Sequence, residues 1–264
     1  MRVAVISDVH GRADALADAA RGVDALLCLG DFVLFLDYAD HAQGIMGSLF
    51  GAEAVGRFVA LRTARRYDEA REVSRSLWAG LGGDKEEVVA REVRRQYDEQ
   101  LVVLAATGVP TYLTFGNVDA PPVLREALAA LGAPVDRLRL LDGEAVDLDG
   151  KRVGFVGGGL TSPMRTPYEV TEEAYAASLA ALGPVDVLAV HVPPALPELT
   201  YDVVARRFET GSRPTLDVVR RTQPEHVLFG HVHQPLARRL RVGRTEAVNV
   251  GHFRQTRRPF HLEW

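Results

Sequence analysis

Polar side chains that can bind metal ions recur directly after the predicted strands of this 264-residue chain. They belong to Asp, His and Asn, which offer oxygen and nitrogen donors to divalent cations. These donors are Asp8, His10, Asp31, Asn117, His191, His231 and His233. Carboxylates such as Asp8 and Asp31 would repel each other at close range unless a cation lay between them. The residue types therefore predict a site for two divalent metal ions, with this group as its metal-binding and catalytic residues.

The elements that would position these donors form an α/β pattern. Apolar runs predict the strands that precede the donors, over residues 3–6, 24–29, 110–115, 185–190 and 226–229. Helices are predicted between strands, over 13–21, 121–131, 169–182 and 215–222. Other strands are predicted over 138–141, 145–148, 152–156, 236–242 and 245–250, with a hairpin turn at Asp149-Gly150. Alternation of strands and helices is typical of parallel sheets, whose strands end at one edge, so the donors should converge there.

Residues 38–106 interrupt this pattern and predict a helical insertion. Apolar residues recur every four positions, at Val73, Leu77 and Leu81 and again at Val89, Val93, Tyr97 and Leu101. Residues 80–84 predict the turn between the two longer helices. Three roles are open for the insertion: a cap over the metal cleft that selects substrates, a surface for a homodimer, or an addition with its own small core.

Composition and charge limit the domain organisation, the partners and the compartment that can be expected. With 47% hydrophobic and 25% charged residues, the chain can bury one large core, so we expect a single domain over 1–264 that includes the insertion. A net charge of -4 gives no basic signal for nucleic acid or an anionic membrane. The lone Cys28 lies in an apolar run and is expected in the core. Because no signal-peptide core precedes Asp8 and a 107–110 turn breaks the uncharged 101–118 run, we expect a cytoplasmic protein.

The ordered motifs resemble those of the calcineurin-like metallophosphoesterase superfamily. They are Asp8-Val9-His10, Gly30-Asp31, Gly116-Asn117-Val118-Asp119, His191 and Gly230-His231-Val232-His233. The resemblance implies a four-layer αββα sandwich of two mixed sheets with outer helices. It also implies that one metal is bound by Asp8, His10 and His233. The second would be bound by Asn117, His191 and His231, with Asp31 bridging both. Such donors accept Mn, Fe, Zn, Co or Ni.

Val118 departs from the pattern of this superfamily, because members that hydrolyse phosphomonoesters usually have histidine at this position. That histidine protonates the leaving group or binds the phosphate. The resemblance and the departure together predict hydrolysis of a small-molecule phosphate ester, a phosphodiester by preference, through attack by metal-bound hydroxide. The alternatives are a phosphomonoesterase that uses a different general acid and a non-catalytic metal-binding scaffold.

Several polar residues outside the motifs have two readings each. Tyr168, Tyr201 and His252 are candidates for the missing acid, although His252 is also read as an ordinary buried or surface histidine. Arg165 could clamp a phosphate, but a solvated loop arginine is the favoured reading. Asp119, without a histidine to orient, is interpreted as a cap for the helix that follows it.

Overall fold

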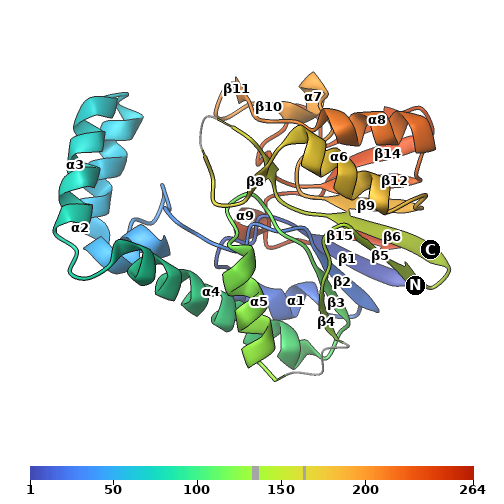
Figure 1. Ribbon diagram of the computed structural model, residues 1–264, viewed down its shortest axis with the longest axis horizontal. Coiled ribbons are helices and arrows are strands. Elements are labelled where there is room, and N and C mark those ends of the chain that lie inside the picture. The colour runs from blue at the N-terminus through green and yellow to red at the C-terminus, as the bar shows by residue number, and fades with distance from the viewer. Residues whose placement is uncertain (133–136, 163–164) are drawn as a thin grey trace.

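Two mixed β-sheets packed face to face form the centre of the molecule, whose computed structural model describes residues 1–132, 137–162 and 165–264 (Figure 1). The five-stranded sheet has the order β15 (Phe260–Glu263), β1 (Arg2–Ile6), β2 (Ala25–Cys28), β3 (Thr111–Leu113) and β4 (Leu138–Leu140). The six-stranded sheet has the order β13 (Arg239–Val242), β14 (Thr245–Asn249), β12 (His226–Phe229), β9 (Val187–Val190), β6 (Lys151–Val156) and β5 (Glu144–Leu148). The inner strands are parallel, and β15, β13 and β5 are antiparallel to their neighbours.

Alternation of apolar side chains along the strands explains how each sheet is covered on both faces. In β1, Val3 and Val5 pack into the core between the sheets, whereas Ala4 and Ile6 pack on the opposite face. Side chains of neighbouring residues in a strand point to opposite faces, so an uninterrupted apolar run requires two covered faces. Cys28 is fully buried on the helix-covered face, as expected for a core residue.

Helices form the two outer layers of the sandwich. The five-stranded sheet is covered by α1 (Leu16–Ala19), which follows a 3-10 turn at Ala13–Ala15, and by α4 (Lys85–Thr107) and α5 (Pro121–Ala130). The six-stranded sheet is covered by α6 (Glu172–Ala181) and α8 (Arg213–Thr222). The order helix, sheet, sheet, helix confirms the predicted αββα sandwich (Figure 1).

Several boundaries and short elements differ from the sequence-based expectation. The helix predicted from residue 169 begins at Glu172, because Thr171 caps it by accepting a hydrogen bond from Ala174 N. Glu169–Val170 instead form β8, which pairs with β7 (Gly159–Leu160). The strand predicted over 236–242 begins at Arg239. Other short elements were not predicted: α7 (Pro197–Thr200), β10 (Tyr201–Asp202), β11 (Arg207–Phe208), α9 (Phe253–Thr256) and β15.

The segment 38–106 is helical, and its helices divide between two cores. α2 (Gly44–Thr63) and α3 (Tyr67–Ala79) extend from the side of the sandwich (Figure 1). They share a small core made of Met46, Val55, Phe58, Val59 and Ala70. α4 belongs to the main core, to which it contributes Val93, Tyr97, Leu101 and Leu104. The helical prediction for this segment is confirmed, with α4 in the main core and α2 and α3 around a smaller core.

Length and composition alone would allow α2 to cross a membrane. Gly51 has φ 76° and ψ 160°, which breaks the helix near its middle. This break divides α2 into two shorter helices. A helix that spans a membrane needs its backbone groups hydrogen-bonded within the helix, which the break at Gly51 interrupts. The uncharged run 101–118 is also divided, as expected, because α4 ends at Thr107 and β3 begins at Thr111.

Candidate metal centre

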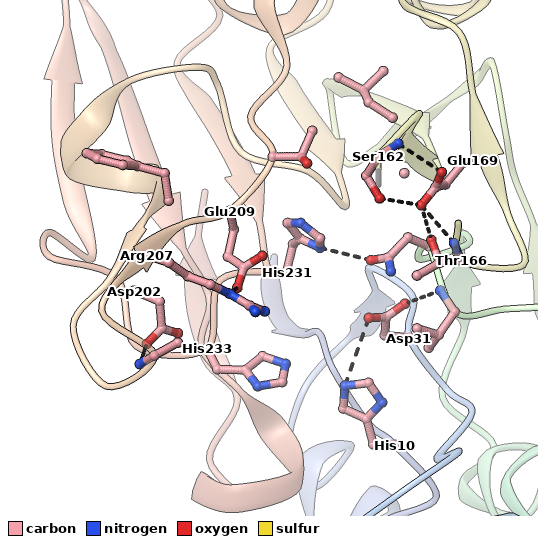
Figure 2. A pocket seen from close by; sticks show the side chains of 17 residues that line it. His10, Asp31, Ser162, Thr166, Glu169, Asp202, Arg207, Glu209, His231 and His233 are labelled. Atoms are coloured by element: carbon pink, nitrogen blue, oxygen red, sulfur yellow. Dashed lines mark hydrogen bonds and ion pairs between the residues drawn. The ribbon is translucent and has the colours of Figure 1, made fainter. Parts of the chain in front are cut away.

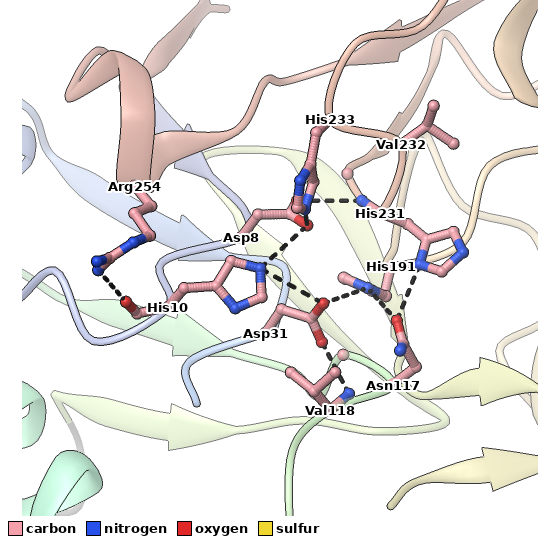
Figure 3. A network of polar contacts seen from close by, with 12 residues as sticks. Asp8, His10, Asp31, Asn117, Val118, His191, His231, Val232, His233 and Arg254 are labelled. Carbon is pink, nitrogen blue, oxygen red and sulfur yellow. Dashed lines mark hydrogen bonds and ion pairs between the residues drawn. The ribbon is translucent and has the colours of Figure 1, made fainter. Parts of the chain in front are cut away.

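All seven predicted donors lie together at the edge where the parallel strands of both sheets end (Figure 3). On one side, Asp8 Oδ1 lies 3.2 Å from His233 Nε2 and 3.8 Å from His10 Nε2. On the other side, Asn117 Oδ1 lies 3.1 Å from His191 Nε2 and 2.8 Å from His231 Nδ1. The donors thus form two adjoining groups.

Asp31 lies between the two groups of donors (Figure 3). Its Oδ2 is 3.9 Å from His10 Nε2 and 3.3 Å from His191 Nε2, so one carboxylate oxygen faces a histidine of each group. Its Oδ1 accepts a hydrogen bond from Val118 N at 3.0 Å. This is the placement that a carboxylate shared by two cations requires.

The backbone of the donor loops is held in an uncommon conformation. Asp8, His10, Asp31 and His231 have positive φ values of 58°, 43°, 57° and 66°. Residues other than glycine rarely adopt the left-handed backbone conformation. Those that do cluster at functional sites, where the surrounding structure holds them in place. Here the loops after β1 and β2 hold each other, since Asp8 N donates to Gly30 O at 3.0 Å and His10 N donates to Asp31 O at 2.8 Å.

Two motif glycines allow the loops to approach each other. A Cβ atom on Gly116 would lie 2.0 Å from Asp31 Oδ1, and one on Gly230 would lie 2.2 Å from Asp8 Oδ2. Any side chain at either position would collide with a donor carboxylate. The glycines of the Gly-Asn and Gly-His-x-His motifs are therefore needed for close packing around the site.

Hydrogen bonds orient the histidine rings toward the carboxylates. His10 Nδ1 lies 2.9 Å from Val33 O, and His191 Nδ1 lies 2.9 Å from Leu29 O. A carbonyl oxygen can only accept, so Nδ1 of each ring carries a proton and Nε2 is the nitrogen that faces the site. Neutral imidazole with one nitrogen fixed in this way is the usual state of a metal ligand.

Buried polar atoms without partners mark the centre of the site. Asp8 Oδ1 and His10 Nε2 are buried and make no hydrogen bond. An unsatisfied buried polar group costs about 1–3 kcal/mol. A divalent cation would satisfy such atoms, and carboxylate, imidazole and amide donors are chemically suited to it. The residues of this site therefore fit the metal ions that the sequence predicts.

The charges of the donors compensate one another. Burial opposes ionisation of Asp8, but His233 holds the pKa of that carboxyl well below its usual range. Burial also opposes protonation of His191, yet Asp31 raises the pKa of that imidazole to about 9. Burial and then the charge of His191 lower the pKa of His231 to about 4. Metal ligands must be deprotonated, so cation binding here would release protons and weaken as pH falls.

Asp119 stabilises the donor loops, and the expectation that it caps the next helix is wrong. Its carboxylate accepts hydrogen bonds from Asp31 N at 2.8 Å, Phe32 N at 3.0 Å and Gly116 N at 2.8 Å. α5 has no side-chain cap. Burial, with the charge of Asp31, raises the pKa of Asp119 to about 7. The carboxylate thus ties the Asp31 loop to the loop that carries Asn117.

α4 supports the same loops with buried polar side chains. The hydroxyl of Tyr97 donates to Asp119 Oδ1 at 3.1 Å and accepts from Ala120 N at 2.7 Å. Gln96 accepts from Leu34 N at 2.7 Å and donates to Leu34 O at 2.9 Å. Gln100 donates to Phe32 O at 3.2 Å. The sequence pattern identified Tyr97 as a core residue, but it gave no signal for what its hydroxyl binds.

The start of α9 supports the loop after β1 from the other side. Arg254 N donates to Asp8 O at 3.0 Å, and Arg254 Nη1 donates to His10 O at 2.6 Å (Figure 3). The same guanidinium forms an ion pair with Asp37. Arg254 therefore joins the loop that carries Asp8 and His10 to the segment that leads into the insertion.

A cleft of about 450 Å³ opens over the donors (Figure 2). Its floor includes His10, Asp31, Asn117, His231 and His233. Its walls come from the hairpin formed by β10 and β11 and, on the other side, from Gly159, Leu160, Ser162, Thr166 and Glu169. Among the described residues that line this cleft, none belongs to 38–106. The described cleft thus gives no support to the cap interpretation, and the role of the insertion stays a prediction.

Both walls of the cleft are held by carboxylates. Glu169 accepts hydrogen bonds from the backbone and hydroxyl groups of Ser162 and Thr166 at 2.7–2.9 Å. Burial opposes its ionisation, but these hydrogen bonds lower the pKa of Glu169 to about 2. In the other wall, Arg207 Nε donates to Glu209 Oε1 at 2.7 Å (Figure 2). Sequence analysis missed Arg207, because an exposed arginine outside any motif carries no signal in the sequence.

Of the three candidate acids, His252 packs its side chain against a donor, whereas Tyr168 contacts Asn117 through a backbone hydrogen bond. Tyr168 donates its hydroxyl to Asp142 at 2.9 Å, and burial with Asp142 raises its pKa to about 12. Tyr201 packs its ring on Phe208 at 5.1 Å. The ring of His252 is stacked on His233 with centroids 3.8 Å apart, and burial followed by His233 lowers its pKa to about 3. Arg165 is exposed and is not among the described residues lining the cleft, which favours the solvated reading.

Comparisons with known proteins agree with this architecture. One crystal structure superposes with a TM-score of 0.63 at 19% identity, over 96% of this chain and 91% of that chain. The crystal structure of TT1561 of Thermus thermophilus superposes with a TM-score of 0.59 at 15% identity, over 99% and 98% of the two chains. No curated protein sequence gives a significant match. Identities this low carry only the fold. The family model described as calcineurin-like phosphoesterase matches residues 1–235, and with most of its length matched, the chain belongs to this family.

Proposed function

We propose that this protein is a dinuclear metal-dependent phosphoesterase that prefers phosphodiesters, or esters with good leaving groups, over alkyl phosphomonoesters. The observation that carries the preference is Val118 in the lining of the cleft. Its backbone N–H donates to Asp31, so this residue adjoins the proposed shared carboxylate. Apart from the proposed metal ligands, the described lining contains no histidine, lysine or tyrosine. A leaving group would therefore find no obvious proton donor there.

Each of the two cations would be bound by its own group of donors, with one donor shared. Asp8, His10 and His233 would hold one, Asn117, His191 and His231 would hold the other, and Asp31 would serve both. When bound, the cations would supply a nucleophile from water near neutral pH and positive charge for the phosphoryl oxygens. His10 and His191 donate Nδ1–H to backbone carbonyls, which leaves Nε2 as the nitrogen that each would offer to a cation. Mn, Fe, Zn, Co and Ni are all compatible with these donors.

The charge of the cleft walls supports a preference for diesters. Among the described residues, the walls carry the carboxylates of Glu169, Asp202 and Glu209 and one cationic side chain, that of Arg207. A monoester is a dianion near neutral pH, so acidic walls oppose its approach more strongly than that of a singly charged diester. The volume of about 450 Å³ also leaves room for a second ester group.

The preference can be tested with p-nitrophenyl phosphate and bis-(p-nitrophenyl) phosphate. We expect the metal-loaded wild type to have the higher kcat/KM for the diester. Val118→His should shift the ratio toward the monoester, by up to about 10²–10⁴-fold if the imidazole acts as a general acid. Val118→Leu is the matched control, because it changes the side chain without adding an acid.

Two outcomes would contradict the proposal. A wild-type enzyme that strongly favours alkyl monoesters would show that another residue supplies the acid, and His252 is the nearest candidate by its contact with His233. A protein that binds these metals but releases no nitrophenol from either ester would be a metal-binding scaffold, although all the expected donors are present.

A further inference from the structure

His252 lies among the proposed ligands of one metal, although it belongs to none of the motifs that identify the site. Its ring is stacked on His233 with an interplanar angle of 13°, and its centroid is 5.7 Å from that of His10. One possible ligand atom from each of His10, His233 and His252 lies within 4.8 Å of the other two. The three imidazoles could therefore contact a common cation.

The backbone around His252 is fixed by a side chain that also holds the Gly-His-x-His loop. Asn249 Nδ2 donates to Gly230 O at 3.2 Å and to Val232 O at 2.9 Å. Asn249 Oδ1 accepts from Gly251 N at 2.9 Å. One buried amide therefore sets the position of the turn before His252 relative to the loop that carries His231 and His233.

The environment of the ring does not match that of an ordinary core histidine. His252 Nε2 is buried and makes no hydrogen bond, and the same is true of the neighbouring His10 Nε2. Buried imidazole nitrogens are normally paired, because leaving them unpaired costs about 1–3 kcal/mol. A cation between these rings would accept both lone pairs.

We propose that His252 is a further protein ligand of the metal held by Asp8, His10 and His233. This inference rests on one part of the proposed function, the binding of a metal at that position, and does not depend on catalysis. The position then has three imidazoles, whereas the position formed by Asn117, His191 and His231 has two imidazoles and an amide oxygen. Imidazole ligands favour Zn, Fe, Co and Ni over Mg, so the His252 position should discriminate against Mg more strongly.

The test compares variants that separate ligation from ring stacking. His252→Phe keeps a flat ring against His233 but removes the nitrogen donor, and His252→Ala removes both. His261→Phe is the matched control, because His261 is exposed on β15. Titration of each apoprotein with Co²⁺ by calorimetry gives the number and affinity of the sites, and the electronic spectrum of bound Co²⁺ reports its ligands.

We expect His252→Phe to weaken one of two Co²⁺ sites by at least about tenfold, to change the spectrum of that site and to leave the other site unchanged. The control should match the wild type. If His252→Phe retains both affinities and the spectrum while His252→Ala loses them, the ring acts by stacking and the proposal is overturned.

A measurement on the wild type avoids any effect of the variants on folding. X-ray absorption of the protein loaded with one equivalent of Zn²⁺ should count three imidazoles if the metal occupies this position. A count of two imidazoles would overturn the proposal if Asn117→Ala gives the same count. That variant lacks a donor of the other position, so its single Zn²⁺ should occupy the position next to His252. A wild type that binds two metals but hydrolyses neither ester would instead contradict the proposed function and leave this inference standing.

Discussion

The two parts of the helical insertion, α4 and the α2–α3 pair, contact different regions of the molecule. α4 places Gln96, Tyr97 and Gln100 in the interior, where they hydrogen-bond to loops that carry or adjoin the proposed metal ligands. The second half of α2 and α3 bury their apolar residues mainly against each other. Figure 1 shows the same division, with α4 along the sandwich and α2 and α3 beyond it.

This difference shows that a segment without a chemical motif can still be part of the support of a site. α4 supplies no metal ligand, but Tyr97 reaches Asp119, which accepts hydrogen bonds from the backbone of Asp31 and Gly116. Groups that orient ligands in this way often change metal affinity by about 10–100-fold when they are removed. The first turn of α2 contacts the same segment, since Ile45 N donates to Leu34 O at 3.0 Å, but none of the described hydrogen bonds of α3 reaches these loops.

The largest effect is expected at Asp31, on the loop that α4 supports. Asp31→Ala removes the carboxylate that faces both groups of donors, so both metals should be lost or weakened. Activity against the diester should fall by at least about 10²-fold. Asn117→Ala is the comparison, because it removes a donor from one group only. Elemental analysis of metal-replete protein checks the result, and two metals retained in Asp31→Ala would contradict the assignment of a shared ligand.

An intermediate effect is expected at Tyr97 and provides the direct test of the comparison. Tyr97→Phe leaves the backbone N–H of Ala120 without its partner and removes one of the hydrogen bonds that Asp119 accepts, which should reduce the free energy of unfolding by about 1–3 kcal/mol. Metal affinity should fall by about 10–100-fold. Tyr67→Phe makes the same chemical change on α3, where the side chain is 55% exposed, and should change neither quantity.

Urea unfolding and Co²⁺ titration of these two variants give the stability and the affinity. A Tyr97→Phe protein that loses stability but keeps wild-type metal affinity would show that α4 supports the fold without positioning the ligands. Equal effects of the two substitutions would remove the distinction between the two parts of the insertion.

The smallest effect on the site is expected from removing the outer part of the insertion. Residues 52–82 can be replaced by a short Gly/Ser linker, because Phe50 and Lys85 both contact the ring of Trp78 and therefore lie close together. Metal content and kcat should be unchanged. We propose that this part of the insertion forms a homodimer surface, so light scattering should show a dimer in the full chain and a monomer after the replacement. Loss of metal would show that α2–α3 also supports the site.

Much of the fold and the candidate site follows from local patterns in the sequence. Apolar runs identified the strands of both sheets that precede the donors, and the Asp149-Gly150 turn joins β5 to β6 as predicted. The prediction that donors such as Asp8, His191 and His231 meet needed only their position after parallel strands. β15 was missed because its partner β1 lies at the opposite end of the chain, and four residues give too little periodicity to identify a strand.

The sequence by itself determined which residue types follow each strand, and with them the chemistry of the candidate site. Only the tertiary structure decided what the remaining polar groups do. Asp119 binds loop N–H groups instead of capping a helix, Tyr97 reaches it from a helix with no motif, and His252 stacks on His233. Local apolar patterns identify the strands, and parallel strands of one sheet end at the same edge, so the residues that follow them meet. The contacts of Asp119, Tyr97 and His252 depend on side-chain directions across elements distant in the sequence, which only packing of the whole domain fixes.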